Sequence, residues 1–228
     1  MLEVEVRRHS PTHPWTYPLL DLRQREILER IQSGGPGAIL ISEVAPVITL
    51  GRRTSPSDLL LDPQALNALG IQTYPVDRGG FATYHGPGQW IVFVVESLER
   101  LTGDRRGVRL AVCKLLNIAL EVGQQFDPSA QIRAGIETGV WTERGKFAAL
   151  GIHIERGVVL HGLAINVFKT PESFVGLRPC GLDAPVDYLV RDVLAPGNVE
   201  DAPLRETRFL ECLKFIQHCL KSSVSDLT

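Results

Sequence analysis

The chain of 228 residues is 44% hydrophobic and 22% charged, which is the balance of an ordinary globular protein. Its length fits one domain that spans residues 1–228. With 24 Lys and Arg against 26 Asp and Glu, the formal charge of -2 argues against nucleic acid or an anionic membrane as a partner.

The first half of the chain reads as a series of strands and helices. Residues 2–7 alternate apolar and charged side chains, as a strand does, and residues 17–32 repeat apolar side chains at helical spacing before a Gly-Gly-Pro-Gly stop. Asp62 and Pro63 form the cap and the first residue of a short helix that ends at Gly70. Further strands are predicted at residues 38–43, 47–50, 71–76 and 90–95.

The second half of the chain is predicted to contain the clearest helix and a three-stranded meander. Residues 108–122 repeat apolar side chains at alternating steps of four and three. Three apolar runs at residues 139–142, 147–154 and 158–167 are separated by two Glu-Arg-Gly triplets, which predicts tight turns between antiparallel strands. With a closing helix at residues 205–220, we predict an α+β fold with a mixed, largely antiparallel sheet flanked by helices.

The cysteine pattern and the N-terminus point to a reducing compartment. No two cysteines form a CxxC pair or a close Cys/His set, so neither a disulfide framework nor a structural zinc site is indicated. The first residues lack the layout of a signal peptide, and no run approaches the length of a membrane span, so we expect a cytoplasmic protein. Free cysteines are usually buried, and we expect this of Cys113, Cys212 and Cys219.

Residues 77–89 concentrate four glycines together with Arg78, Tyr84 and His85. Glycine allows positive φ angles and lets backbone N–H groups approach a ligand closely, so this stretch could hold a carbonyl or phosphate oxygen. The alternative is a loop between two strands that needs glycine only for its turns.

Cys180 lies between Pro179 and Gly181 in a stretch without periodicity, which predicts a constrained turn. A nucleophile is usefully held in that way. The alternative is a small packing residue, because free cysteine is among the most buried residue types.

Lys146 follows a turn and leads into an apolar predicted strand. It is either a solvated strand edge that discourages aggregation or a partner for Cys180. At ~4 Å and an effective dielectric constant of about 20, an ion pair between the two would be worth roughly 4 kcal/mol and would favour the thiolate near neutral pH.

His161 and Asn166 stand near the two ends of a further apolar strand. A satisfied core histidine is the default interpretation of His161. A zinc site built from His85, His161 and Cys180 is an alternative, although no ligand spacing supports it.

Several segments between about residue 38 and residue 181, taken together and in their order along the chain, resemble the lipoyl(octanoyl) transferase family. Two segments depart from the family pattern: residues 43–47 read Glu-Val-Ala-Pro-Val where Glu-His-Pro-Pro-Val is usual, and residues 187–189 read Asp-Tyr-Leu where Thr-Ser-Leu is common. The resemblance is carried by residues 78–89, Gly-Val-Trp at 139–141, Lys146 with the following Ala-Leu-Gly at 149–151, His-Gly at 161–162 with Asn-Val at 166–167, and Pro-Cys-Gly at 179–181.

The resemblance implies a fold like that of biotin and lipoate protein ligases, and an acyltransferase that moves an octanoyl group from acyl carrier protein to a specific lysine. The implied acceptors are the lipoyl domains of 2-oxoacid dehydrogenases and the glycine-cleavage carrier protein, and no metal, nucleotide or other cofactor is implied. Cys180 would carry the octanoyl group as a thioester, while Lys146 would stabilise the thiolate and relay a proton. The implied substrate-binding residues are Arg78, Gly79, Gly80, Phe81, Ala82, Thr83, Tyr84, His85, Ala149, Leu150, Gly151, Gly162, Leu163 and Ala164.

Two other functions stay open at this point. An ATP-dependent lipoate or biotin protein ligase would also acylate a domain lysine but would not need Cys180. A non-enzymatic sensor that keeps the acyl pocket would form no covalent adduct. Because acyl carrier proteins are typically acidic, an arginine patch is expected to dock the donor, and the candidates are Arg52, Arg53, Arg105, Arg106 and Arg109.

Overall fold

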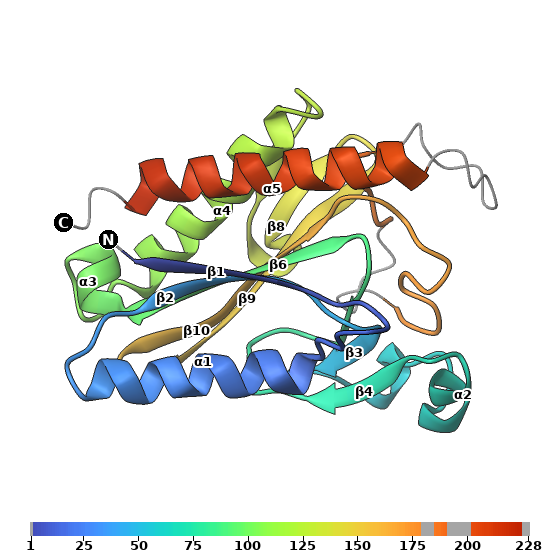
Figure 1. Ribbon diagram of the computed structural model, residues 1–228, viewed down its shortest axis with the longest axis horizontal. Coiled ribbons are helices and arrows are strands. Elements are labelled where there is room, and N and C mark those ends of the chain that lie inside the picture. Colours follow the sequence, from blue (N-terminus) through green and yellow to red (C-terminus); the bar gives the residue numbers. More distant parts are fainter. Residues whose placement is uncertain (1, 179–184, 191–201, 225–228) are drawn as a thin grey trace.

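A seven-stranded sheet with helices on both faces forms the centre of the molecule (Figure 1). The computed structural model describes residues 2–178, 185–190 and 202–224. Strand β1 runs parallel to β2, and every other neighbouring pair in this sheet is antiparallel, which confirms the predicted α+β fold with a mixed, largely antiparallel sheet. In spatial order the strands are β1 (Glu3–Arg8), β2 (Ala38–Glu43), β6 (Gln89–Ser97), β10 (Val158–Asn166), β9 (Gly145–Glu155), β8 (Gly139–Thr142) and β7 (Gln131–Arg133).

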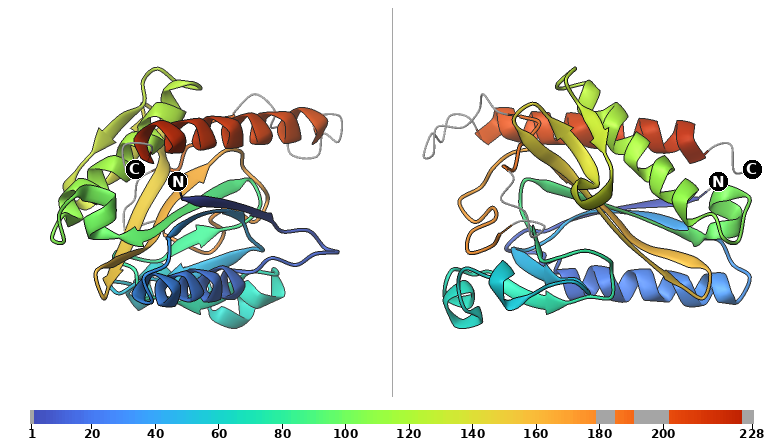
Figure 2. Two further views of the ribbon diagram at one scale, coloured as in Figure 1. Left: turned by 60° about the vertical axis from the view of Figure 1, so that its left-hand side comes forward. Right: turned by 180° about the vertical axis from the view of Figure 1, so that it is seen from behind.

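Alternate residues of the central strands supply two separate cores, because successive side chains of a strand point to opposite faces. In β6, Val92 and Val94 belong to the core under α4 (Val108–Gln124) and α5 (Ala202–Val224). Their neighbours in β6 belong to the core under α1 (Tyr17–Gln32), on the other face. Figure 2 shows the sheet between these two helical layers.

A small second sheet carries the glycine-rich segment to the main sheet. Its strand order is β4 (Gln72–Pro75), β3 (Val47–Leu50) and β5 (Thr83–His85), with β3 parallel to β4 and antiparallel to β5. As expected for a glycine-rich segment, residues 77–89 are not regular throughout, because the strand residues among them are only the three of β5 and Gln89, which begins β6.

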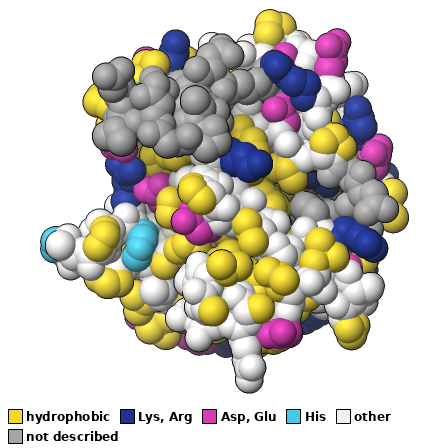
Figure 3. Space-filling model, turned by 90° about the vertical axis from the view of Figure 1, so that its right-hand side faces the viewer, with side chains coloured by type: hydrophobic (Ala, Val, Ile, Leu, Met, Phe, Trp, Pro, Cys, Tyr) yellow, Lys and Arg dark blue, Asp and Glu magenta, His cyan; other side chains and the backbone are white. Residues whose placement is uncertain are grey.

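Short helix α2 (Pro63–Ala68) lies beside the small sheet at one end of the molecule. The Asp62 side chain accepts from the N–H groups of Gln64 and Ala65 at 2.8 and 2.9 Å, which confirms the predicted cap. Leu60 and Leu69, which flank α2, are exposed, and Figure 3 shows hydrophobic side chains over the lower half of the face at this end. Apolar side chains are therefore exposed at this end.

The predicted helices and the meander are confirmed, with small shifts at their ends. The closing helix is longer than predicted, and the turns at the two Glu-Arg-Gly triplets join β8 to β9 and β9 to β10 as expected. Sequence reasoning missed the short elements, which have too few residues to show a period: β5, α3 (Leu98–Thr102), β7 and the 3-10 turns Pro56–Asp58 and Gly135–Glu137.

The prediction for the three packing cysteines is right for two of them. Cys212 and Cys219 of α5 are buried. Cys113 is exposed, so its predicted burial is wrong. The buried face of α4 is formed by residues such as Leu115 and Ile118, and Cys113 lies on the opposite side with exposed Asn117 one turn later. Among the helices that the structure describes, none is both long and apolar enough to span a membrane.

Candidate active site

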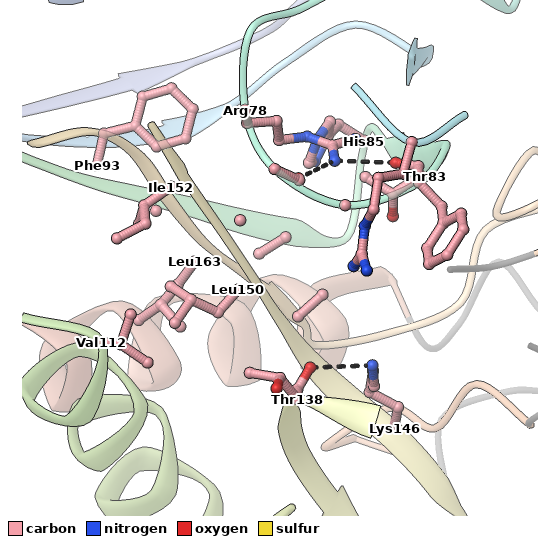
Figure 4. A pocket seen from close by; sticks show the side chains of 18 of the residues that line it. Arg78, Thr83, His85, Phe93, Val112, Thr138, Lys146, Leu150, Ile152 and Leu163 are labelled. Carbon is pink, nitrogen blue, oxygen red and sulfur yellow. Dashed lines mark hydrogen bonds between the residues drawn. The ribbon is translucent and has the colours of Figure 1, made fainter. Parts of the chain in front are cut away.

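A cavity of about 290 Å³ lies where the glycine-rich segment meets strands β9 and β10 (Figure 4). We call it the central cavity. The loop is held on β9 by the N–H of Gly79, which donates to the carbonyl oxygen of Ile152 at 3.1 Å. The volume is near the lower end of the range for small-molecule sites.

The central cavity has an apolar side and a polar side. In Figure 4, Phe93, Val112 and Leu163 lie on one side, while Lys146 and Thr138 lie on the other. These apolar side chains come from β6, α4 and β10 and pack in both cores of the protein. The arrangement suits a ligand with an apolar tail and a polar, reactive end.

Lys146 presents its ammonium group on the polar side of the cavity. Its Nζ donates to the carbonyl oxygen of Thr138 at 3.1 Å and lies 5.0 Å from the centre of the Trp141 ring. The residue is buried, and no carboxylate within the described residues forms an ion pair with it. A buried ammonium group without a carboxylate is well suited to an anionic partner.

The backbone of Lys146 is paired on both sides. On one side it lies opposite Trp141 of β8. On the other, its N–H donates to the carbonyl oxygen of Pro185 and its carbonyl oxygen accepts from the N–H of Asp187, both at 2.9 Å. The interpretation of Lys146 as a solvated strand edge is therefore wrong.

Two glycines line the cavity where a side chain would not fit. A Cβ atom on Gly162 of β10 would lie 2.3 Å from the carbonyl oxygen of Val92 in the neighbouring strand. A Cβ atom on Gly151 of β9 would lie 3.1 Å from the carbonyl oxygen of Gly79 and from the Cδ of Arg78. Glycine at these positions lets β6 and the loop approach closely.

Arg78 shapes the glycine-rich loop. Its guanidinium group donates to the carbonyl oxygen and hydroxyl of Thr49 at 3.1 and 2.7 Å, and to the carbonyl oxygens of Gly79 and Phe81 at 3.1 and 2.9 Å. Since these bonds tie the loop to β3, Arg78 fixes the wall of the cavity that it also lines.

His85 is held by a chain of buried side chains. The Nε2 of Gln89 donates to the carbonyl oxygen of Tyr84 at 3.1 Å and to the Oδ1 of Asn166 at 2.8 Å, so its Oε1 faces the Nδ1 of His85 at 2.6 Å. Nδ1 of His85 therefore carries the proton. Burial and the nearby charge of Arg78 lower the pKa of His85 to about 3, so this ring is neutral at physiological pH.

His161 is a buried core residue, as its default interpretation predicts, but its buried Nε2 has no hydrogen-bond partner among the described residues. Its Nδ1 lies 3.2 Å from the hydroxyl of Tyr17, and its backbone N–H donates to the Oε1 of Gln24 at 2.9 Å. Its φ angle is 60°, in the left-handed region. Among the described residues no group of three or more His, Cys, Asp or Glu could hold a metal ion.

Most of the residues predicted to bind substrate line the central cavity, and their role stays a prediction. All line it except Ala82 and Tyr84. In β5, Thr83 and His85 face the cavity. Tyr84, and Ala82 just before the strand, face the opposite side and join a small core with Ile48. Cys180 lies outside the described residues.

Sequence reasoning missed several residues that line the cavity. In a sequence, an apolar residue on a helix or strand looks the same whether it faces a core or a cavity, so no signal marked Tyr17, Phe93, Val112 or Ile152. Gly135 and Thr138 also line the cavity, and they belong to no motif that the sequence analysis found.

With this geometry in view, comparison with known proteins gives the family. Residues 21–202 match the family model of the lipoyl protein ligase A/B catalytic domain. The chain belongs to this family. It is 38% identical over 162 residues to the octanoyltransferase of Gloeobacter violaceus, which covers 71% of this chain and 68% of that protein. It is 32% identical over 212 residues to the octanoyltransferase of Magnetococcus marinus, which covers 92% and 93%.

Solved structures of this fold agree with the family. The bi-partite lipoate protein ligase of Thermoplasma acidophilum aligns with a TM-score of 0.64 at 13% identity, covering 99% of this chain and 85% of that one. A lipoate-protein ligase A bound with ATP aligns with a TM-score of 0.61 at 12% identity, covering 99% and 92%. These likenesses show the fold alone. With octanoyltransferases as relatives, this lipoyl protein ligase A/B family member is a transferase enzyme.

The two segments that depart from the family pattern both have structural roles. In the first, the departing residues are Val44, which is buried in the core under α1, and Ala45, whose N–H donates to the carbonyl oxygen of Trp15 at 2.9 Å. Glu43 beside them, which matches the family pattern, accepts from the N–H of Gly88 at 3.0 Å through Oε1 and from Arg8 at 2.8 Å through Oε2. The carboxylate of Asp187 accepts from the hydroxyl of Thr142. Both carboxylates are buried and anchor segments that border the cavity residues.

Proposed function

We propose that this protein transfers an octanoyl group from acyl carrier protein to a specific lysine of lipoyl domains, through a thioester on Cys180. One cytoplasmic catalytic domain would do this without ATP or metal. The acceptors would be the lipoyl domains of 2-oxoacid dehydrogenases and the glycine-cleavage carrier protein. The observation that carries the proposal is the buried ammonium group of Lys146, which faces a partly apolar cavity and has no carboxylate partner among the described residues.

Backbone hydrogen bonds of Arg178 and Pro185, on either side of Cys180, support a contact between Cys180 and Lys146. Pro185 is hydrogen-bonded to the backbone of Lys146, and Arg178 donates its N–H to the carbonyl oxygen of Asp58 at 2.8 Å. Cys180 is five residues before Pro185 and two after Arg178. Chain length alone therefore keeps its Cα within roughly 18 Å of the Cα of Pro185.

The apolar side of the cavity supports a medium-length acyl group as the cargo. Phe93, Val112 and Leu163 offer hydrocarbon surface and no charge. Burying the six methylenes of an octanoyl tail would contribute about 5 kcal/mol, which is enough to discriminate chains that leave part of the cavity empty.

In the first step, the thiolate of Cys180 attacks the thioester carbonyl of the donor. The bond between the acyl carbon and the donor sulfur breaks, and the donor leaves as a thiol with the proton of the Lys146 ammonium group. In the second step, the amine of the acceptor lysine attacks the Cys180 thioester and gives its proton to the neutral Lys146 amine. The amide forms, the bond to Sγ breaks, and the thiolate and ammonium pair is restored.

The test is mass spectrometry of the intact protein after incubation with octanoyl-acyl carrier protein without ATP. We expect one octanoyl mass on Cys180, and transfer to a lipoyl domain that Cys180→Ser abolishes and Cys113→Ser leaves intact. Lys146→Ala should keep the fold and lose most of the activity, typically by 10²-fold or more, on the order of a lost acid–base group. Transfer that requires ATP and survives Cys180→Ser would instead show a ligase.

A further inference from the structure

Arg53 stands at the central cavity with its guanidinium group stacked on an aromatic ring. Its Cζ lies 4.5 Å from the centre of the Phe81 ring, and both residues line the cavity. The backbone N–H of Arg53 donates to the carbonyl oxygen of Gly80 at 3.0 Å, so the residue is fixed to the glycine-rich loop. Unlike Lys146, Arg53 is exposed.

The described lining of the cavity is cationic and has no compensating carboxylate. It contains Arg53, Arg78 and Lys146 but neither Asp nor Glu. Arg78 is engaged with protein oxygens, and Lys146 donates to Thr138. For the guanidinium group of Arg53, the described part of the chain supplies no hydrogen bond and no ion pair, so its donors face solvent.

We propose that Arg53, oriented by Phe81, binds the phosphate group on the pantetheine arm of the acyl donor. The inference rests on the proposed function. With the acyl tail at Val112 and Leu163 and the thioester near Lys146, the rest of the arm leaves the cavity at its exposed side, where Arg53 stands.

The chemistry of the arginine side chain fits this ligand. The planar guanidinium group presents paired N–H donors that match two oxygens of a phosphate. Stacking on the Phe81 ring limits the orientations of the group before binding, which reduces the entropy lost on binding. A lysine at this position would supply the charge without the paired geometry.

The anionic group that binds Arg53 could instead be an acidic side chain on the surface of the carrier protein. Small donors separate these sources, because octanoyl-phosphopantetheine and octanoyl-pantetheine lack the carrier protein and differ only in the phosphate. The measurement is kcat/KM for transfer to a lipoyl domain with octanoyl-acyl carrier protein and with each of the two small donors, for the wild-type enzyme, Arg53→Gln and Arg53→Lys.

We expect the preference of the wild-type enzyme for the phosphorylated donor to fall about tenfold or more in Arg53→Gln, with Arg53→Lys in between. The matched control is Arg7→Gln, because exposed Arg7 also stacks on an aromatic ring, with its Cζ 5.1 Å from the centre of Trp15, and does not line the cavity. The Arg7→Gln variant should prefer the phosphorylated donor as strongly as the wild-type enzyme does.

An unchanged preference in Arg53→Gln would overturn the inference, as would equal losses with both donors. A loss seen only with the intact acyl carrier protein would assign Arg53 to the protein surface of the donor and would also overturn it. If the wild-type enzyme accepts octanoyl from none of the donors, the proposed function itself fails, so the two failures are distinct.

Discussion

Asp187 donates its backbone N–H to the carbonyl oxygen of Lys146 at 2.9 Å, although the two residues are far apart in the sequence. The carbonyl oxygen of Asp187 in turn accepts from the Nδ2 of Asn166 at 3.4 Å, and the backbone carbonyl of Asn166 accepts from the N–H of Leu189 at 3.1 Å. The end of β10 therefore holds the segment 185–190 beside the lysine.

Replacing Asn166 with alanine should loosen this segment. The variant removes one of the two acceptors of the Gln89 Nε2 and the Nδ2 donor to the carbonyl oxygen of Asp187, so we expect the free energy of unfolding to fall by about 1–3 kcal/mol. Octanoyl transfer should fall as well, because the segment no longer fits against Lys146. Urea unfolding and transfer assays check this, and Asn117→Ala, at an exposed site on α4, should change neither. An Asn166→Ala variant as stable and active as the wild type would contradict it.

Gly162→Ala should destabilise the protein strongly. The added Cβ would lie 2.3 Å from the carbonyl oxygen of Val92, and backbone in the middle of a sheet moves aside only at the cost of ladder hydrogen bonds. We expect a loss of about 3 kcal/mol or more in the free energy of unfolding. Gly79→Ala is the control, because its Cβ would meet only the carbonyl oxygen of Ile152 at an ordinary 3.6 Å. Similar unfolding midpoints for the two variants would show that β6 and β10 can separate freely.

The sequence predicts most of the elements here because local patterns determine them. The helix over residues 17–32 follows from its apolar period, and the turns of the meander follow from Glu-Arg-Gly. The pairing of Lys146 with Pro185 and Asp187 does not follow, since a contact between distant residues depends on how the whole sheet folds. For the same reason, the sequence does not predict that Tyr17 and Val112 line the cavity. Their apolar spacing indicates core residues, and only the packing of α1 and α4 on the sheet brings them to the cavity.

Acid should destabilise the protein through two buried histidines. Burial, with the nearby charge of Arg78, lowers the pKa of His85 and of His161 from 6.5 to about 3. Between these values the unfolded chain binds a proton at each site and the folded protein does not, so the free energy of unfolding falls as the pH drops from about 6.5 towards 3. The slope is at most about 1.4 kcal/mol per pH unit for each histidine.

Urea unfolding of His161→Asn at pH values between about 7 and 5 checks this, since asparagine tolerates the positive φ angle at this position. Its stability should depend less steeply on pH than that of the wild type, whereas His13→Asn, at an exposed site, should keep the wild-type slope. Equal slopes for all three proteins would mean that His161 titrates normally in the folded state.

The four cysteines should differ in their rate of alkylation by iodoacetamide, because the thiolate is the reactive form. Burial raises the pKa of Cys212, and burial with the neighbouring Glu121 raises that of Cys219 to about 11, so both should react only on unfolding. Exposed Cys113 should react in the folded protein and serves as the reference. If Lys146 holds Cys180 as a thiolate, Cys180 should react first at about pH 6, and Lys146→Met should slow it about tenfold or more while leaving Cys113 unchanged. Peptide mapping after short exposures measures each rate, and a Cys180 that is no faster than Cys113 would show that Lys146 does not activate it.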